Sequence, residues 1–234
     1  LDVGGRYQCA YTNEQPTERA KYTLNAEPIV EVDISACNPT ILTAMTGYVH
    51  PSWVACEVLH PYETLVAEDF TKAEIKDIIV RLIGAGNANK KAGFADYQLG
   101  LAEVSSTNKK GEPTRYKGTD RYKALLKHLR EMLPGLNDLK RGVLDGNTFS
   151  FHESQIMTRL AHARMYLGHP TYILHDGVIV PESEAAAVAH QLQVTFEGYC
   201  DQMGWPLFIR PSVTHERGKV EVADRLPMTI RRRP

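Results

Sequence analysis

The chain alternates between apolar runs with strand character and apolar residues spaced at helical intervals. The run 28–32 predicts a strand that leads directly into Asp33. Asn38 then suits a helix N-cap and Pro39 the first helical turn, so we expect a short helix over 40–45. Both kinds of pattern recur along the chain, which predicts an α+β fold.

A second helix, expected over 71–83, has the clearest boundaries. Thr71 and Glu74 have the spacing of a capping box, in which each side chain bonds the backbone of the other residue. Gly84 and Gly86 are expected to end this helix. Its apolar residues recur every three or four positions, at Ile75, Ile78, Ile79, Leu82 and Ile83.

The segment 105–141 begins with polar residues that predict loops and continues as a helix ending at Pro134. The apolar face of that helix consists of Tyr122, Leu125, Leu126, Leu129 and Leu133. Ser150 and Glu153 repeat the capping-box spacing and predict another helix over 152–167.

The run 171–180 consists of two short apolar segments on either side of Asp176-Gly177, which is typical of a β-hairpin turn. A long helix is expected over 183–199. Together, the strand 28–32 and the hairpin predict a small antiparallel sheet, backed by the helices over 152–167 and 183–199.

The composition is that of an ordinary folded protein: 43% of the 234 residues are hydrophobic and 24% are charged. No apolar run is long enough to span a bilayer, so we expect no membrane partner. Four widely spaced cysteines form no zinc-binding pair and are expected to be free thiols: Cys9, Cys37, Cys56 and Cys200. With no leader pattern at the start, these features predict a cytoplasmic protein.

The formal net charge of −1 is the sum of segregated parts. Residues 105–141 hold ten Lys and Arg against four Asp and Glu, and residues 225–234 hold four Arg and no acid. The remainder holds 13 basic and 24 acidic residues. The near-neutral total therefore does not exclude nucleic-acid binding.

Two carboxylates have the context of a candidate metal site. Asp33 follows an apolar strand and Asp176 lies at the tip of an apolar hairpin, so each would project from the edge of a packed sheet. Brought together, they could bind Mg²⁺, which takes oxygen ligands and often shares them with substrate phosphates. The alternative is that Asp33 is a local cap and Asp176 a turn residue.

A cationic stretch on the helix over 71–83 is a candidate phosphate-binding surface. Lys72 and Lys76 are one turn apart, and Arg81 lies further along. A bound triphosphate would offset the repulsion between the two lysines. The alternative is a solvated face, because Glu74 and Asp77 on the same helix also offset the charge.

The order of these features resembles the palm and finger motifs of family A DNA polymerases and of the related single-subunit phage-type RNA polymerases. The stretch Glu31-Val-Asp33-Ile-Ser35-Ala is similar to the first catalytic motif, and Leu174-His175-Asp176-Gly177 to the His-Asp hairpin. The Lys72 and Lys76 spacing is similar to the finger-helix motif. Short polymerase-like bacterial and phage proteins show a similar order of motifs.

The resemblance implies a template-directed nucleotidyltransferase that holds Mg²⁺, or Mn²⁺, on the catalytic residues Asp33 and Asp176. It implies nucleoside triphosphate binding by Lys72, Lys76, Arg81, Asn38 and Ser35. It implies contacts to a primer and template nucleic acid from Arg6, His175, Glu153 and Gln155. The expected architecture is one palm-like domain over 1–234, with a helical finger-like insertion at about 60–147 and a basic tail at 225–234.

Several positions depart from that family. Asn38 replaces the Glu that excludes a ribose hydroxyl, and Gly84-Ala85 replaces the Tyr-Gly that checks the nucleotide. The chain also lacks room for complete thumb, finger and proofreading domains, so we expect an accessory protein or further domains. Two other functions remain open: a nucleic-acid-binding palm module without chemistry, and a metal-dependent phosphodiesterase.

Overall fold

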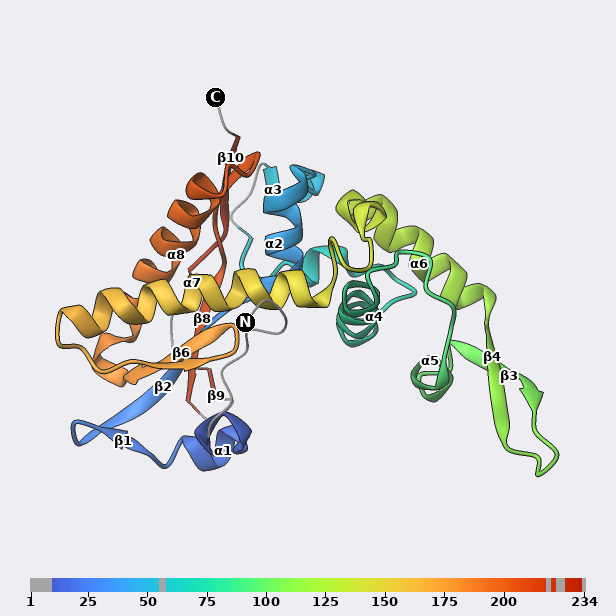
Figure 1. Ribbon diagram of the computed structural model, residues 1–234, viewed down its shortest axis with the longest axis horizontal. Helices are drawn as coiled ribbons and strands as arrows, with labels where there is room; N and C mark the ends of the chain where they lie inside the picture. Colours follow the sequence, from blue (N-terminus) through green and yellow to red (C-terminus); the bar gives the residue numbers. More distant parts are fainter. Residues whose placement is uncertain (1–9, 55–57, 218–219, 222–225, 233–234) are drawn as a thin grey trace. The chain divides into compact units, whose positions relative to one another are not determined.

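The computed structural model describes residues 10–54, 58–217, 220–221 and 226–232. The chain divides into two compact units (Figure 1). The first unit comprises Leu1–Thr64 and Asn147–Pro234, and the second is the segment between them, Leu65–Gly146. Among the described residues, no helix is both long enough and apolar enough to cross a lipid bilayer.

The described part of the first unit is built on a six-stranded antiparallel sheet, which confirms the expected α+β class with small antiparallel sheets. Five strands follow the order β5-β6-β2-β8-β9, and β1 pairs with the start of β2. A separate pair joins β7 to β10. The bounds are β1 Thr23–Leu24, β2 Glu27–Ile34, β5 Tyr172–Leu174, β6 Gly177–Pro181, β7 Leu207–Arg210, β8 Val213–Arg217, β9 Val220–Glu221 and β10 Thr229–Arg232.

The central strand β2 is longer than the predicted 28–32. It extends through Asp33 to Ile34, because both neighbouring strands continue to pair with it: Asp33 lies opposite Gly177 of β6 and opposite Thr214 of β8. Asp33 is therefore held inside the sheet on both sides and does not lie beyond the end of the strand.

Among the helices of the first unit, α8 packs on this sheet, whereas α2 lies against β7 and α3 against β10 (Figure 1). Their bounds are α1 Pro16–Arg19, α2 Cys37–Thr46, α3 Pro51–Val54, α7 Gly146–Tyr166 and α8 Ala185–Gln202. Short 3-10 turns lie at Ala10–Asn13, Glu63–Leu65 and Glu182–Glu184. Helix α8 confirms the helix expected over 183–199, and it lies against β2, β6, β7 and β8.

Helix α7 packs beside α8 through buried polar and aromatic contacts. His152 Nδ1 and the Tyr199 hydroxyl share a hydrogen bond at 2.8 Å. Near the other end of α7, buried Arg164 forms an ion pair with Glu184, and its Nε donates to the Thr171 hydroxyl at 2.8 Å. These contacts tie α7 to the start of α8 and to the segment that enters the β5–β6 hairpin.

Two expected helix starts were wrong. Asn38 is not an N-cap: α2 begins at Cys37 after Ala36, which has φ +54° and whose backbone oxygen accepts a bond from Thr40 N at 3.1 Å. Ser150 and Glu153 form no capping box either, because α7 begins four residues earlier at Gly146 and already buries Phe149 in its first turn. Both helices therefore begin earlier than their local sequence signals predicted.

The second unit consists of helices and one β-hairpin. Their bounds are α4 Lys72–Ala85, α5 Phe94–Gln98, β3 Ala102–Thr107, β4 Pro113–Gly118, α6 Asp120–Met132 and a 3-10 turn at Pro134–Asp138. The capping box of Thr71 and Glu74 is confirmed, and so is the buried face of α4. Gly84 does not end α4, which continues to Ala85 and stops at Gly86, whose φ is +58°.

The β3–β4 hairpin falls in a segment where the sequence predicted loops.

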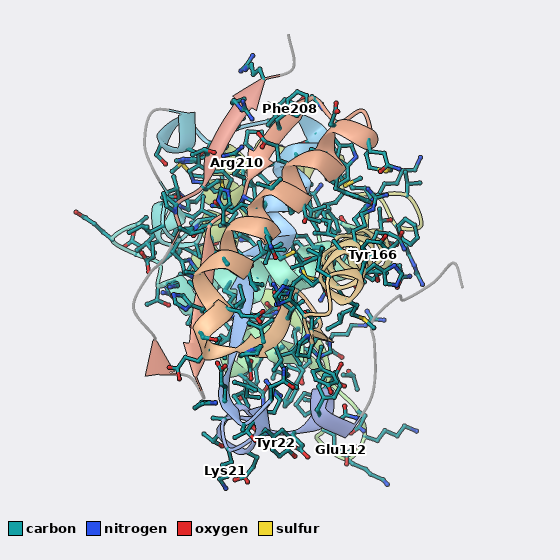
Figure 2. All side chains as sticks on the ribbon, turned by 90° about the vertical axis from the view of Figure 1, so that its left-hand side faces the viewer. Lys21, Tyr22, Glu112, Tyr166, Phe208 and Arg210 are labelled. Carbon is teal, nitrogen blue, oxygen red and sulfur yellow. The ribbon has the colours of Figure 1, made fainter. Side chains whose placement is uncertain are left out.

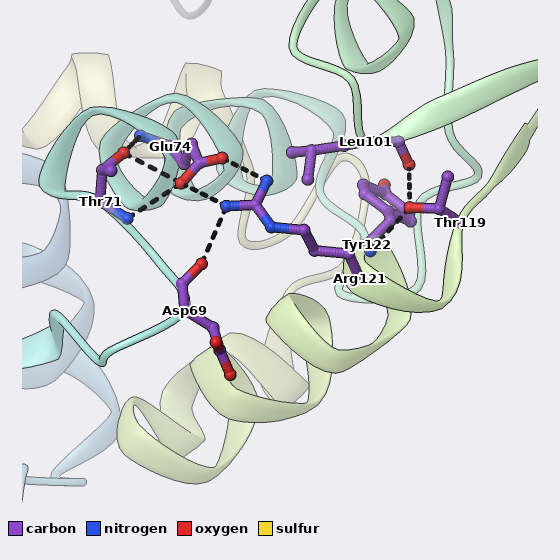
Figure 3. Close-up of polar contacts among 7 residues, drawn as sticks. All are labelled: Asp69, Thr71, Glu74, Leu101, Thr119, Arg121 and Tyr122. Atoms are coloured by element: carbon purple, nitrogen blue, oxygen red, sulfur yellow. Dashed lines mark hydrogen bonds and ion pairs between the residues drawn. The ribbon is translucent and has the colours of Figure 1, made fainter.

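Arg121 joins α6 to the start of α4: it bonds Glu74 with two nitrogens, at 2.6 and 3.0 Å, and the backbone oxygen of Asp69 at 2.8 Å (Figure 3). Thr119 caps α6 by accepting a bond from Tyr122 N, and its hydroxyl donates to Leu101 O at 2.9 Å (Figure 3).

Candidate functional site

The two faces of β2 have different chemistry. Side chains alternate between the faces of a strand, so Val30, Val32 and Ile34 share one face, and all three are buried. Glu31 and Asp33 share the opposite face, and both are partly exposed. The sheet therefore has one fully apolar face on β2 and one face that carries carboxylates.

The β5–β6 hairpin brings Asp176 next to Asp33. Leu174 pairs with Gly177, so the turn consists of His175 and Asp176, one residue earlier than an Asp-Gly turn would be. His175 has φ +44°, the left-handed conformation required at the first turn residue. The backbone oxygen of Asp176 accepts a hydrogen bond from Ile34 N at 3.2 Å, which fixes the turn to the end of β2.

Gly177 provides the space that the Asp33 carboxylate occupies. A Cβ at position 177 would lie 1.8 Å from Asp33 Oδ1 and 2.6 Å from Val32 O. No other residue type fits there without moving either the carboxylate or the backbone of β2. Glycine at this position is therefore required by close approach of the Asp33 side chain.

The pKa of Asp33 is raised well above its ordinary value. Burial is the main cause, and the nearby negative charges of Asp176, Glu31 and Glu216 add to it. Glu31 and Glu216 lie directly opposite each other on β2 and β8, which is itself an unfavourable like-charge pair. The local environment thus penalises a second negative charge and favours a bound cation.

Arg19 partly offsets this negative charge. Its Nε and Nη2 donate to the two oxygens of Glu31 at 2.7 and 3.0 Å, and Nη1 donates to the backbone oxygen of Glu14. The positive charge of Arg19 also lowers the pKa of Asp33, against the larger opposing effects. Because the Arg19 side chain is only 7% exposed, the ion pair is shielded from solvent.

Two further polar side chains belong to this part of the unit. Ser35 is 6% exposed, and its hydroxyl has no hydrogen-bond partner among the residues described. Tyr62 is buried; burial raises the pKa of its hydroxyl, and the charge of Asp176 adds to the shift. Ser35 was predicted as a nucleotide-binding residue from the motif, and that role stays a prediction.

A groove of about 530 Å³ lies on the sheet, and neither Asp33 nor Asp176 lines it. Ile29 lines it from β2, on the same face as Glu31 and Asp33 and about 13 Å from Asp33 by strand rise. Tyr11, Tyr22 and Tyr172 supply its aromatic walls and Lys21 its positive charge. Figure 2 shows Lys21 and Tyr22 next to each other at one end of this unit.

The second unit carries the three basic residues that were predicted to bind a triphosphate. Lys76 is exposed on α4, and Lys72 is partly exposed in its first turn. Arg81 forms an ion pair with Asp77 and a 2.7 Å ion pair with buried Asp96. The role of Lys72, Lys76 and Arg81 at a nucleotide stays a prediction.

The other predicted nucleic-acid contacts have varied surroundings. Arg6 lies outside the described residues. Glu153 is 2% exposed within α7, whereas Gln155 and His175 are partly exposed. Asn38 is partly exposed in the first turn of α2. Of this group, His175 alone belongs to the turn that carries Asp176.

Sequence reasoning missed three contributors to the site: Arg19, Glu31 as a charged neighbour, and Glu216. Glu31 could have been found, because it precedes Asp33 by two residues on the same strand and so shares its face. Arg19 and Glu216 had no local signal, because their proximity arises from pairing across the sheet and from the position of α1.

The donor chemistry of Asp33 and Asp176 fits a hard divalent cation. Both offer carboxylate oxygens, and burial together with the neighbouring negative charges raises the pKa of Asp33. No group of three or more His, Cys, Asp or Glu side chains in the described part of the chain is arranged to hold a metal. The two carboxylates would therefore need oxygen ligands from a substrate or from water to complete the coordination of Mg²⁺.

Comparison with known proteins adds no further constraint: no family model matches the sequence, and no curated protein is significantly similar to it.

Proposed function

We propose that the first unit is a palm-like nucleotidyltransferase that extends a nucleic acid strand from nucleoside triphosphates under the direction of a template. One observation carries the proposal. Asp33 lies opposite Gly177 in the sheet, and Asp176 immediately precedes that glycine, so the two aspartates are neighbours across adjacent antiparallel strands. Their mutual repulsion contributes to the raised pKa of Asp33.

Asp33 and Asp176 would hold Mg²⁺, or Mn²⁺ in its place. When bound there, the metal supplies charge neutralisation at the phosphates and lowers the pKa of the attacking hydroxyl. The chain's own residues have the task of positioning. Gly177 leaves room for the Asp33 carboxylate, the bond from Ile34 N fixes the Asp176 turn, and the ion pair with Arg19 offsets the charge of Glu31.

The test is incorporation of labelled nucleotides on primed DNA and RNA templates, with Mg²⁺ or Mn²⁺. We expect template-dependent extension by the wild-type protein, and a loss of at least about a hundredfold in Asp33→Asn and in Asp176→Asn. Asp138→Asn, which removes an exposed carboxylate in the second unit, is the matched control and should retain wild-type extension.

Other outcomes separate the alternative functions. Metal-dependent shortening of the primer without extension would identify a phosphodiesterase that uses the same carboxylates. Nucleic-acid binding without extension under any template, nucleotide or metal would favour a non-catalytic module and would overturn the proposal.

A further inference from the structure

Three aromatic rings form an exposed cluster in the second unit. Phe94 and Tyr97 lie on α5 and Tyr116 on β4, with ring centroids 6.5, 6.1 and 5.6 Å apart. Phe94 is 57% exposed and Tyr97 is 45% exposed. Aromatic rings that contact one another yet keep this much surface in water have not been buried as part of a core.

The rings are held on a fixed support. The backbone N–H of Gly93, just before α5, donates to Asp96 Oδ2 at 2.7 Å, and the other oxygen of buried Asp96 accepts from Arg81 at 2.7 Å. Helix α5 is thereby attached to α4. Its exposed rings, Phe94 and Tyr97, therefore project from an anchored turn.

The hairpin that carries the third ring is anchored as well. Tyr116 lies opposite Val104, and Val104 is also exposed, so the two extend the apolar surface along one face of the hairpin. Immediately after β4, the bonds of Thr119 to Leu101 and Tyr122 join the hairpin to α6 (Figure 3).

A cavity lined by lysines shares one of these rings, Tyr116. It has a volume of about 270 Å³ and is lined in part by Lys91, Lys117, Lys123, Tyr116 and Tyr122. Lys123 is paired with Asp120 at 2.7 Å, and Glu103 lies opposite Lys117 in the hairpin. Across residues 90–123 there are eight Lys and Arg against four Asp and Glu, and one of those acids, Asp96, is buried against Arg81. The segment 90–123 as a whole therefore carries a net positive charge.

We propose that the Phe94, Tyr97 and Tyr116 cluster, together with Lys91, Lys117 and Lys123, is a binding surface for single-stranded nucleic acid. Unstacked bases lie against the rings, and the lysines contact the phosphates that connect those bases. Proteins that bind single strands without sequence preference combine these two elements, a basic groove and aromatic rings. The surface does not depend on Asp33 or Asp176 and lies wholly within the second unit.

The combination of features favours a single strand over a duplex or a protein partner. In a duplex the faces of the bases are stacked on one another and inaccessible to the rings, whereas the phosphates are denser and attract lysines more strongly. A protein partner would cover the rings but would not require three lysines beside them. The rings therefore predict a preference for single strands, and the lysines predict salt dependence.

The experiment measures binding of fluorescent single-stranded DNA and RNA oligonucleotides, and of a duplex of the same length, by anisotropy over a series of salt concentrations. We expect the full-length protein to bind the single strands more tightly than the duplex. Phe94→Ala, Tyr97→Ala and Tyr116→Ala should each weaken single-strand binding about 5-fold to 100-fold and reduce this preference, with little change in the salt slope.

The lysine variants should change the salt dependence of binding and not the preference for single strands. The double variant Lys91→Gln/Lys117→Gln should bind single strands with a weaker salt dependence: the slope of log binding constant against log salt concentration should fall in magnitude by about 1.4. The preference for single strands over duplex should remain. Two controls match the chemistry of these changes: Tyr166→Ala removes a ring that is 91% exposed on α7 (Figure 2), and Lys140→Gln removes an exposed lysine of the second unit. Neither control should change binding.

Circular dichroism and thermal melting check that each variant is folded. The proposal is overturned if the wild-type protein does not bind single strands at low salt, if duplex binds more tightly than single strands, or if the ring variants bind as the controls do. Binding to anionic lipid vesicles that ignores the ring variants would reassign the lysines to a membrane surface. The proposed surface shares no residue with the Asp33 and Asp176 site, so a failure of nucleotide incorporation leaves this test independent.

Discussion

The two units use charge in opposite ways. The second unit, Leu65–Gly146, holds 15 Lys and Arg and 11 Asp and Glu, whereas the rest of the chain holds 12 and 17. The first unit places carboxylates together on a partly buried sheet face, where their repulsion raises the pKa of Asp33. The second unit places its lysines in water beside exposed rings. Charges that are close and desolvated suit metal chemistry, and charges that are solvated suit a long polyanion.

Each unit also contains an arginine that bonds a glutamate with two nitrogens, which allows a direct comparison. In the first unit, the side chains of Arg19 and Glu31 are 7% and 14% exposed. In the second, those of Arg121 and Glu74 are 43% and 13% exposed. The geometry is similar, so the difference in solvent access should decide how much each pair contributes to stability.

The largest expected effect comes from removing Arg19. Arg19→Gln leaves Glu31 largely buried, unpaired and opposite Glu216, and should lower the free energy of unfolding by about 3 kcal/mol. Arg121→Gln removes the more exposed pair and should lower it by about 1 kcal/mol or less. Urea denaturation followed by circular dichroism measures both.

The double variants test whether the lost ion pair is the cause. Arg19→Gln with Glu31→Gln should recover much of the loss, because no buried charge is left unpaired. Equal losses for Arg19→Gln and Arg121→Gln would contradict the distinction between a desolvated and a solvated unit.

The next effect concerns the close approach of Asp33 to Gly177. Gly177→Ala places a methyl group 1.8 Å from Asp33 Oδ1 and 2.6 Å from Val32 O, and should cost about 1–3 kcal/mol of stability and displace the carboxylate. Gly198→Ala is the control: its new methyl group meets nothing within 4 Å in α8, so it should stabilise by about 0.5–1 kcal/mol. Relative to wild type, the melting temperature should therefore fall for Gly177→Ala and rise for Gly198→Ala.

Much of the fold could be predicted from local sequence patterns. The capping box of Thr71 and Glu74, the apolar face of α6 and the β5–β6 hairpin are local features, because each depends on residues within a few positions of one another. The position of Asp33 beside the hairpin followed from the resemblance in motif order, and the pairing of Asp33 with Gly177 gives it a physical basis.

What the sequence could not supply depends on long-range pairing. Glu216 of β8 is 185 residues from Glu31 of β2 along the chain, so their opposition has no local signal. The β3–β4 hairpin was missed because its strands are polar and exposed, and its turn region Asn108-Lys109-Lys110-Gly111 also fits a loop. The start of α7 at Gly146 was missed because the Ser150 and Glu153 spacing pointed to a later start.

A third effect tests the electrostatic cost of ionising Asp33 in the folded protein. Because the pKa of Asp33 is raised on folding, its ionisation disfavours the folded state, and stability should fall as pH rises above about 3.8, its ordinary value, through the raised pKa. Asp33→Asn should therefore be more stable than wild type by about 0.5–2 kcal/mol at neutral pH without metal. The advantage should vanish in acid, where Asp33 is protonated in both states.

Melting curves in EDTA from pH 3.5 to 8, about one scan for every half unit of pH, measure this difference. Adding Mg²⁺ should raise the melting temperature of the wild type and have a smaller effect on Asp33→Asn, because a cation bound to the folded state stabilises it. An Asn variant that is less stable than wild type at neutral pH would show that Asp33 is well compensated, and would remove the electrostatic argument for a cation.

The smallest expected effect lies in the second unit. Thr71 accepts a hydrogen bond from Glu74 N at 3.3 Å at the start of α4, so Thr71→Ala should cost about 0.5–1 kcal/mol, whereas Thr71→Ser keeps the hydroxyl and should cost less. Urea denaturation measures the loss. The Mg²⁺-dependent rise in melting temperature serves as the readout of the first unit and should be the same in both variants, because no residue of the carboxylate site is changed. If Thr71→Ala abolished that rise, the carboxylate site would depend on the second unit, and the two regions could not be treated as energetically separate.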